Sequence, residues 1–195
     1  MLDVMLQLAL TAKLVQLSMV ISNSFLLRKY EPTVSDLSKT QFDNALKLIQ
    51  EHFNGVTDKD GQPYVTHCLR VMHQVQGLEC QLVALMHDLI EDTSVTIEDL
   101  HEIGFEASVI TAIDLMTHRD EDSYCEYVVA LKTNPLARQV KMADLSDNAS
   151  LNRVLLRQES WHADTRRVQK YIVSYQFLTD RISEVQYREL MQELE

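Results

Sequence analysis

Hydrophobic residues recur at spacings of three and four along most of the chain, which is the period of one face of an α-helix. Phe42, Leu46, Ile49 and Phe53 predict a helix over 36–54 that ends just before a glycine. The same pattern, with its capping residues and glycine stops, predicts further helices at 64–76, 79–92, between Thr96 and Gly104, at 106–116, 123–132 and 135–145, and a long pair from residue 163 onward.

The first part of the chain is apolar but does not have the pattern of a membrane span. Its uncharged interval, 14–27, contains several polar residues and is too short to cross a bilayer core of about 30 Å. A secretory signal would begin with basic residues, whereas this segment begins with Asp3. We therefore expect residues 1–35 to form a helical extension that packs on the domain or on a second subunit, with a single domain over 36–195. A homo-oligomer is one expectation from this segment.

Composition agrees with an all-α fold. The 195 residues are 46% hydrophobic and 24% charged, which is enough apolar surface for one compact core. The 4 Gly and 3 Pro are few for a strand-rich fold with many turns. Three cysteines without a CxxC pair, Cys68, Cys80 and Cys125, predict buried, reduced thiols and a cytoplasmic protein.

The net charge of −11 opposes binding to nucleic acid or to an anionic membrane. A phosphate-bearing substrate would need a metal ion or local cations. Of the cations, Lys59 and Arg153 stand out because each lies close in sequence to a segment with candidate metal ligands. The others are expected to be mostly ordinary surface charges: Arg119, Lys132, Lys141 and the pair Arg166-Arg167.

The most informative chemistry is His87-Asp88 inside an otherwise apolar helix. Burying an imidazole beside a carboxylate costs several kcal/mol unless both have partners. A divalent metal is one such partner, and His67 and Asp144 are the candidates for two further ligands. Two imidazoles and two carboxylates suit Mn²⁺, Fe²⁺ or Zn²⁺ without deciding among them. The alternative is a hydrogen-bonded core histidine.

Two further pairs lie near these ligands. Glu91 and Asp92 follow His87 and Asp88 by one helical turn, so one of these acids is positioned to orient or deprotonate a metal-bound water, unless both belong to a solvated face. Asn148 lies one turn after Asp144 and is a candidate to bind substrate, unless it and its neighbour Asp147 only cap the next segment. The remaining histidines lack paired spacing and are expected to be structural or exposed: His52, His73, His101, His118 and His162.

Three motifs occur in an order that resembles a known family. They are G-x-P-Y-x-x-H at 61–67, H-D-x-x-E-D-T at 87–93 and V-K-x-A-D-L-x-D-N at 140–148. With His52, they are similar to the HD-superfamily hydrolase domain of Rel/SpoT-type alarmone enzymes and their stand-alone small relatives, over about residues 40 to 180. Two positions depart from the family: Cys68 stands where proline is usual, and the turn Asp58-Lys59-Asp60 stands where Arg-Lys-Ser contacts guanine.

The resemblance implies an all-helical HD fold that holds one divalent ion, typically Mn²⁺, through His67, His87, Asp88 and Asp144. It further implies that Glu91 and Asp92 manage the attacking water and that Asn148 contacts the nucleotide. The family reaction removes the 3′-pyrophosphate of guanosine tetra- or pentaphosphate by attack of a metal-bound water on phosphorus. Other phosphorylated nucleotides, such as a 5′-nucleotide or NADPH, are alternative substrates, and a non-catalytic nucleotide-binding module is the alternative function.

Overall fold

The computed structural model describes residues 34–58, 61–151, 153 and 158–194. The chain divides into two compact units, 1–37 and 38–195, and the second contains nearly all of the described residues. The predicted N-terminal helical extension falls mainly on residues 1–33 and so lies outside the described residues, as does Lys59. The division of the chain at residue 35 stays a prediction.

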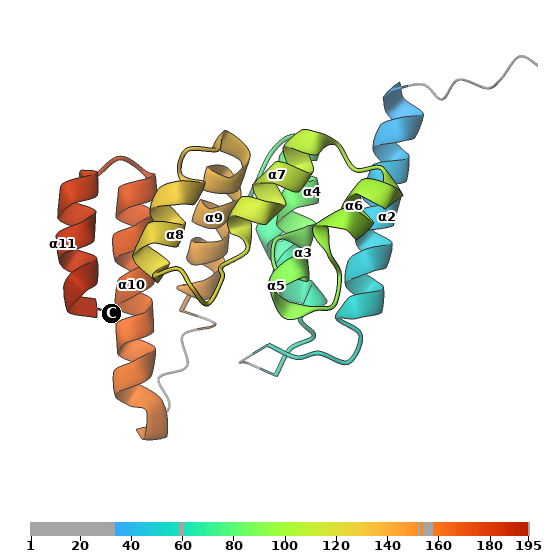
Figure 1. The fold of residues 1–195 in the computed structure, drawn as a ribbon. Helices are drawn as coiled ribbons and strands as arrows, with labels where there is room; N and C mark the ends of the chain where they lie inside the picture. The colour runs from blue at the N-terminus through green and yellow to red at the C-terminus, as the bar shows by residue number, and fades with distance from the viewer. Residues whose placement is uncertain (1–33, 59–60, 152, 154–157, 195) are drawn as a thin grey trace, which may run out of the picture. The chain divides into compact units, whose positions relative to one another are not determined.

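The regular elements of the described chain are all helices, apart from one isolated β-bridge between Thr57 and Pro63 (Figure 1). The elements are α2 Val34–His52, α3 Val65–His73, α4 Leu78–Met86, α5 Leu89–Asp92, α6 Ile97–Ile103, α7 Ala107–Met116, α8 Tyr124–Leu131, α9 Pro135–Asn148, the 3₁₀ turn η1 Gln158–Ser160, α10 Trp161–Leu178 and α11 Glu184–Leu194. None of the described helices has the length and apolarity needed to cross a membrane. The expected all-α bundle is confirmed.

Helix α4 forms the centre of the core. It packs against α3, α7 and α9, and its residues from Leu82 to Met86 are fully buried. Apart from Glu79 and Gln81 near its start, the helix is apolar around its circumference, as expected for a helix that packs against neighbours on several sides. At the other end of the domain, α10 packs against α9 and α11. The cysteines Cys68, Cys80 and Cys125 are buried, as predicted, and form no disulfide within the described part of the chain.

The predicted helix 79–92 is interrupted in the structure. Helix α4 ends at Met86, and Asp88 has φ −102° and ψ 2°, between the helical and extended regions. The chain resumes one short turn, α5, at Leu89. Periodicity did not indicate this break because the apolar positions continue across it. Smaller differences are that α3 ends at His73 and that α9 extends to Asn148.

Gly104 ends α6 in the left-handed conformation, with φ 92°, as the sequence predicts. A Cβ atom added at position 104 would meet no atom within 4 Å, so the free-energy cost of a substitution comes from the backbone conformation. We expect Gly104→Ala to destabilise the protein by about 1–2 kcal/mol, because L-residues are disfavoured in this conformation. Gly104→Asn should cost less, since asparagine tolerates it. Urea unfolding of the two variants checks this; equal stability of Gly104→Ala and wild type would contradict it.

Candidate active site

The four predicted metal ligands lie together although they come from three separate parts of the chain. His67 lies in α3, His87 and Asp88 lie between α4 and α5, and Asp144 lies in α9. The Nε2 atoms of His67 and His87 lie 3.3 and 3.6 Å from Oδ1 of Asp144, and 3.8 and 2.9 Å from Oδ2 of Asp88. The donor atoms of His67, His87 and Asp88 lie within 4.8 Å of one another, and Asp144 lies beside both histidines.

The other ring nitrogen of each histidine is already occupied. Nδ1 of His87 lies 2.9 Å from the carbonyl oxygen of Ala84, which can only accept, so this nitrogen donates. Nδ1 of His67 lies 2.7 Å from Oδ2 of Asp147 and 2.8 Å from Nη1 of Arg153. Both Nε2 atoms are thereby left to face the cluster. This is the usual arrangement of metal-binding histidines, whose second ring nitrogen donates to a carbonyl or carboxylate.

One polar atom of the cluster lacks a hydrogen bond in the described ranges of the chain. Nε2 of His87 is fully buried and makes no hydrogen bond to any of the residues that the structure describes. A buried polar atom in this state costs free energy, and native structures contain few of them. A divalent cation among the four donor atoms would satisfy it, and the mixed nitrogen and oxygen set suits Mn²⁺, Fe²⁺ or Zn²⁺. The described chain therefore carries a His/Asp cluster that fits such an ion.

The electrostatics of the cluster also favour a cation. Burial lowers the pKa of His87, but Asp88 and Asp144 outweigh burial and hold that pKa well above its ordinary value. Burial likewise raises the pKa of Asp144, but Lys141 and the two imidazoles hold it well below its ordinary value. The carboxylates thus stay ionised and attract positive charge to this point.

Three polar groups support the carboxylates. The Tyr64 hydroxyl donates to Oδ2 of Asp88. The Lys141 ammonium lies 3.0 Å from Oδ2 of Asp144, and the Asn148 amide donates to Oδ1 of Asp144 at 2.5 Å. Lys141 belongs to a group of cations expected to be mostly ordinary surface charges, but its side chain is only 11% exposed and pairs with a predicted metal ligand. Asn148 lies beside Asp144, where the sequence places it.

Glu91 and Asp92 lie in α5, directly after the cluster, and both line the same cavity. Oε2 of Glu91 accepts the backbone N–H of His118 at 2.9 Å, which fixes one carboxylate oxygen. Burial raises the pKa of Glu91, and the nearby Asp88 carboxylate raises it further. The side chains of Glu91 and Asp92 are nevertheless exposed at the cavity. A carboxylate with a raised pKa is a better proton acceptor than one at the ordinary value, which suits general acid–base chemistry.

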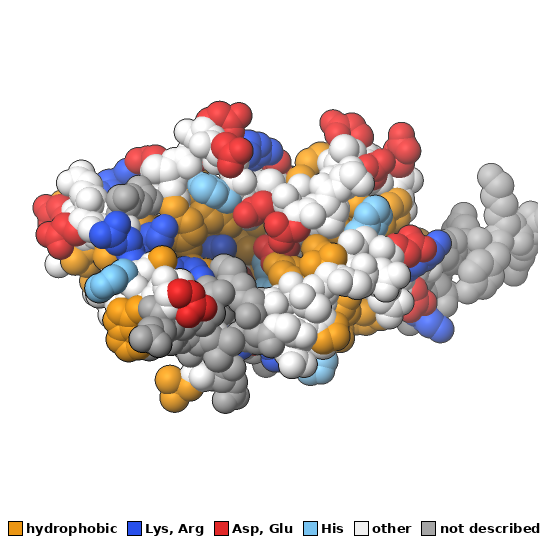
Figure 2. Space-filling view, turned by 90° about the horizontal axis from the view of Figure 1, so that it is seen from below, with side chains coloured by type: hydrophobic (Ala, Val, Ile, Leu, Met, Phe, Trp, Pro, Cys, Tyr) orange, Lys and Arg blue, Asp and Glu red, His pale blue; other side chains and the backbone are white. Residues whose placement is uncertain are grey.

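The cavity over the cluster has a volume of about 390 Å³. Seen from below, the molecule is hollowed near the middle of this face, where acidic, basic and histidine side chains gather among hydrophobic ones (Figure 2). The predicted residues that line the cavity are His67, Asp88, Glu91, Asp92, Asp144, Asn148 and Arg153. Residues that the sequence analysis did not assign to a site also line it: Thr57, Asp58, Tyr64, His118, Tyr124, Tyr127, Lys141 and Tyr171. His87 lies buried beneath them.

Tyr64 stands in the G-x-P-Y-x-x-H motif directly before α3, whereas no local motif marks the tyrosines of α8 and α10. Asp147 was considered only as a helix cap, whereas the structure buries it against His67. A signal for it was present, since Asp147 follows Asp144 by three residues on one helix and so faces nearly the same way. His118, expected to be structural or exposed, is half-buried at the cavity and holds Glu91 through its backbone.

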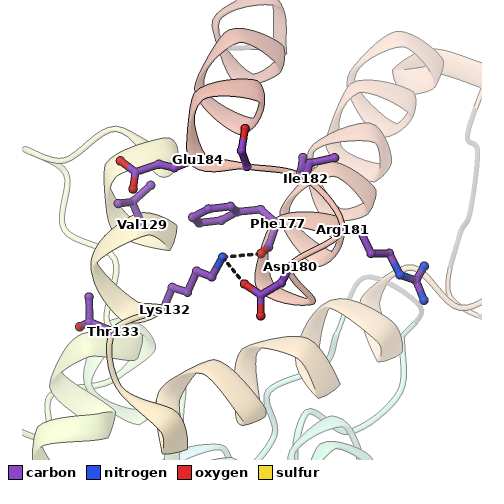
Figure 3. Close-up of a pocket in the computed structure, with 9 residues that line it drawn as sticks. Val129, Lys132, Thr133, Phe177, Asp180, Arg181, Ile182 and Glu184 are labelled. Carbon is purple, nitrogen blue, oxygen red and sulfur yellow. Dashed lines mark hydrogen bonds and ion pairs between the residues drawn. The ribbon is translucent and has the colours of Figure 1, made fainter.

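A second cavity, of about 520 Å³, lies between α8 and the turn joining α10 to α11 (Figure 3). Lys132 extends into it, and its ammonium donates to the Phe177 carbonyl oxygen at 2.7 Å and lies 2.8 Å from Asp180. The same ammonium lies 3.7 Å from the centre of the Phe177 ring. Lys132 is therefore a tether between two helical segments rather than a cation held ready for phosphate.

No family model matches the chain. Over 147 residues it is 27% identical to a GTP pyrophosphokinase of Streptomyces coelicolor, which covers 69% of this chain and 17% of that protein. It is 26% identical over 119 residues to a guanosine-3′,5′-bis(diphosphate) 3′-pyrophosphohydrolase of Aquifex aeolicus, covering 55% of this chain and 17% of that protein. The corresponding protein of Vibrio cholerae is 30% identical over 116 residues, which are 52% of this chain and 16% of that protein. The chain thus spans less than a fifth of the length of these relatives.

The structure also resembles a solved one. It aligns with a TM-score of 0.56 and 20% identity, covering 78% of this chain and 94% of the other, to a protein described as a metazoan ortholog of SpoT that hydrolyzes ppGpp and plays a role in starvation responses. The fold and the sequence similarities together place the chain among all-helical proteins that resemble the hydrolase domain of Rel/SpoT-type enzymes. The resemblance stated from the motifs is confirmed.

Proposed function

We propose that this protein is a divalent-metal-dependent nucleotide phosphohydrolase, with removal of the 3′-pyrophosphate of (p)ppGpp as its first candidate reaction. The observation that carries the proposal is the cluster itself. The two Nε2 atoms lie 2.9 to 3.8 Å from the two carboxylates, and the buried Nε2 of His87 makes no hydrogen bond among the described residues although Oδ2 of Asp88 lies 2.9 Å away. The acid pair of α5 lines the same cavity. The names of the relatives support the choice of substrate.

His67, His87, Asp88 and Asp144 would hold one ion, with Mn²⁺ as the first candidate and Fe²⁺ or Zn²⁺ as alternatives. When bound, such an ion acts as a Lewis acid on a phosphoryl oxygen and increases the acidity of water. Glu91 and Asp92 would accept the proton of the attacking water. The fixed carboxylate oxygen of Glu91 leaves its other oxygen for this task.

Asn148, Arg153 and Lys59 are proposed to contact the substrate. Asn148 and Arg153 line the cavity, with Arg153 Nη1 3.0 Å from the Asn148 amide oxygen. The role of Lys59 rests on its sequence position alone. A cytoplasmic location, a homo-oligomer and the lack of binding to nucleic acid or a membrane stay predictions.

Release of pyrophosphate and orthophosphate by the purified, metal-analysed protein tests the proposal. The substrates are guanosine tetraphosphate, NADPH and common nucleotides, each with saturating Mn²⁺. Pyrophosphate from the tetraphosphate supports the first candidate. Tight nucleotide binding without turnover on any substrate would instead support a non-catalytic binding module.

One observation favours another nucleotide as the second candidate. The carboxylate of Asp58 lines the cavity, and its Oδ2 lies 3.3 Å from Nη2 of Arg153. Asp147 binds the same guanidinium at 2.5 Å. Asp58 and Asp147 therefore offset part of the charge of this cation, since both also lie near Arg70. A partly offset cation suits a substrate with fewer phosphates. Orthophosphate from a 5′-nucleotide or NADPH, with none of the tetraphosphate cleaved, would identify this case.

A further inference from the structure

On the side of its ring away from the cluster, His67 contacts the carboxylate of Asp147. The sequence motifs assign this carboxylate no role in the site. Oδ2 of Asp147 lies 2.7 Å from Nδ1 of His67, on the side of the ring away from Asp144, and Nη1 of Arg153 lies 2.8 Å from the same nitrogen. His67 and Asp147 lie 80 positions apart in the sequence. Asp147 is 6% exposed and does not belong to the four-residue cluster. Burial of a carboxylate outside the cluster has to be explained, because removing its charge from water costs free energy.

Two arginines hold the Asp147 carboxylate in position. Arg70 donates through Nε to Oδ1 at 2.8 Å and through Nη2 to Oδ2 at 3.1 Å, in a bidentate contact. Arg153 donates through Nη1 to Oδ2 at 2.5 Å. These contacts hold the pKa of Asp147 far below its ordinary value despite its burial, with the hydrogen bond from His67 the largest favourable cause. Both oxygens of the carboxylate accept from guanidinium groups, which can only donate.

Asp58 completes this network from the loop between α2 and α3. Its Oδ2 lies 3.3 Å from Nη2 of Arg153 and 3.8 Å from Nη2 of Arg70. Its Oδ1 accepts the backbone N–H of Gln62 at 2.9 Å. The network thus balances two carboxylates against two guanidiniums. Buried ion pairs of this kind contribute little stability compared with apolar packing, so stability alone is a weak explanation for it.

We propose that Asp147 is a positioning residue that fixes the ring orientation and tautomer of His67, and that Arg70 and Arg153 hold Asp147 for this purpose. The inference rests on the metal site of the proposed function. A carboxylate that accepts Nδ1–H leaves the lone pair of Nε2 directed at the cluster and makes it a stronger ligand. Removing such an outer partner costs about 10–100-fold in metal affinity.

The test compares Mn²⁺ binding by the full chain and three variants, measured by calorimetry. Asp147→Asn keeps the size of the side chain and removes its charge, and we expect the dissociation constant to rise about 10–100-fold. Asp164→Asn is the matched control, because Asp164 is an equally buried carboxylate that pairs with an arginine, 3.1 Å from Arg167, outside the cavity. It should bind Mn²⁺ as wild type does.

Arg70→Gln covers the case in which Asp147→Asn does not fold. The Arg70 side chain is 40% exposed, so its replacement should be tolerated, and it should weaken Mn²⁺ binding less than Asp147→Asn does. Wild-type affinity in both Asp147→Asn and Arg70→Gln would overturn the inference while leaving the metal site in place. Failure of wild type itself to bind Mn²⁺ would overturn the proposed metal site, and the inference with it.

A spectroscopic measurement distinguishes positioning from a general loss of structure. In long-range ¹H–¹⁵N spectra of the metal-free protein, the hydrogen-bonded Nδ1 proton of His67 should shift in Asp147→Asn. The Nδ1 proton of His87, which binds the Ala84 carbonyl oxygen, is the internal control and should not move. An unchanged His67 signal in this variant would contradict the positioning role.

Discussion

Replacement of His87 by alanine is expected to remove the bound metal and reduce turnover at least about 10³-fold, while the helical fold remains. His87 is fully buried, and its Nε2 lies within 3.6 Å of both Asp88 and Asp144. Loss of one of four ligands weakens binding of the ion. The charge stabilisation that a metal ion supplies to a phosphoryl-transfer transition state is several kcal/mol, which corresponds to this factor. Metal analysis, phosphate release and circular dichroism measure the three outcomes.

Asp144→Asn is a second, isosteric variant for the same prediction, because it removes a carboxylate without leaving a void. His101→Ala is the matched control, since His101 is an exposed histidine in α6. The control should keep both metal and turnover. Full activity in His87→Ala or in Asp144→Asn would contradict the proposed metal-dependent mechanism.

Glu91→Gln is expected to reduce turnover by about 10²–10⁴-fold while the metal content stays at the wild-type level, because the variant loses a proton acceptor and no ligand. The pH dependence gives a further signature. Burial raises the pKa of Glu91, and a base acts only when deprotonated, so activity should fall as the pH decreases through this raised value. Phosphate release measured across the acidic range checks the profile.

The matched control for this prediction is Glu98→Gln, which changes a glutamate in the first turn of α6, outside the cavity. It should leave the rate and the pH profile unchanged. If Glu91→Gln loses the metal together with activity, Glu91 supports the metal site rather than the proton transfer. A wild-type rate in this variant would assign the proton to another group, with Asp92 as the next candidate.

Much of the fold was predictable because helical periodicity is a local property. The spacing of apolar residues and the stops at Gly55 and Gly104 placed most helices within a few residues of their observed ends. The break at Asp88 was not predictable in this way. Its backbone leaves the helical region at a point where its carboxylate binds Tyr64, 24 residues earlier in the chain.

The order of residues along the chain was enough to specify the helical class and the residue types of the cluster, because the buried His87-Asp88 pair demands partners wherever it is placed. The contacts between distant segments became known from the folded arrangement alone: Asp147 holds the His67 ring from 80 positions away, and Tyr64 and Asp144 approach Asp88 and His87 from other parts of the chain. Lys141 and Asp144 lie within one helical turn of each other, but the burial of this pair was also decided by packing. The physical reason is that local patterns act over one or two turns of a helix, whereas these contacts depend on how α3, α4 and α9 pack together.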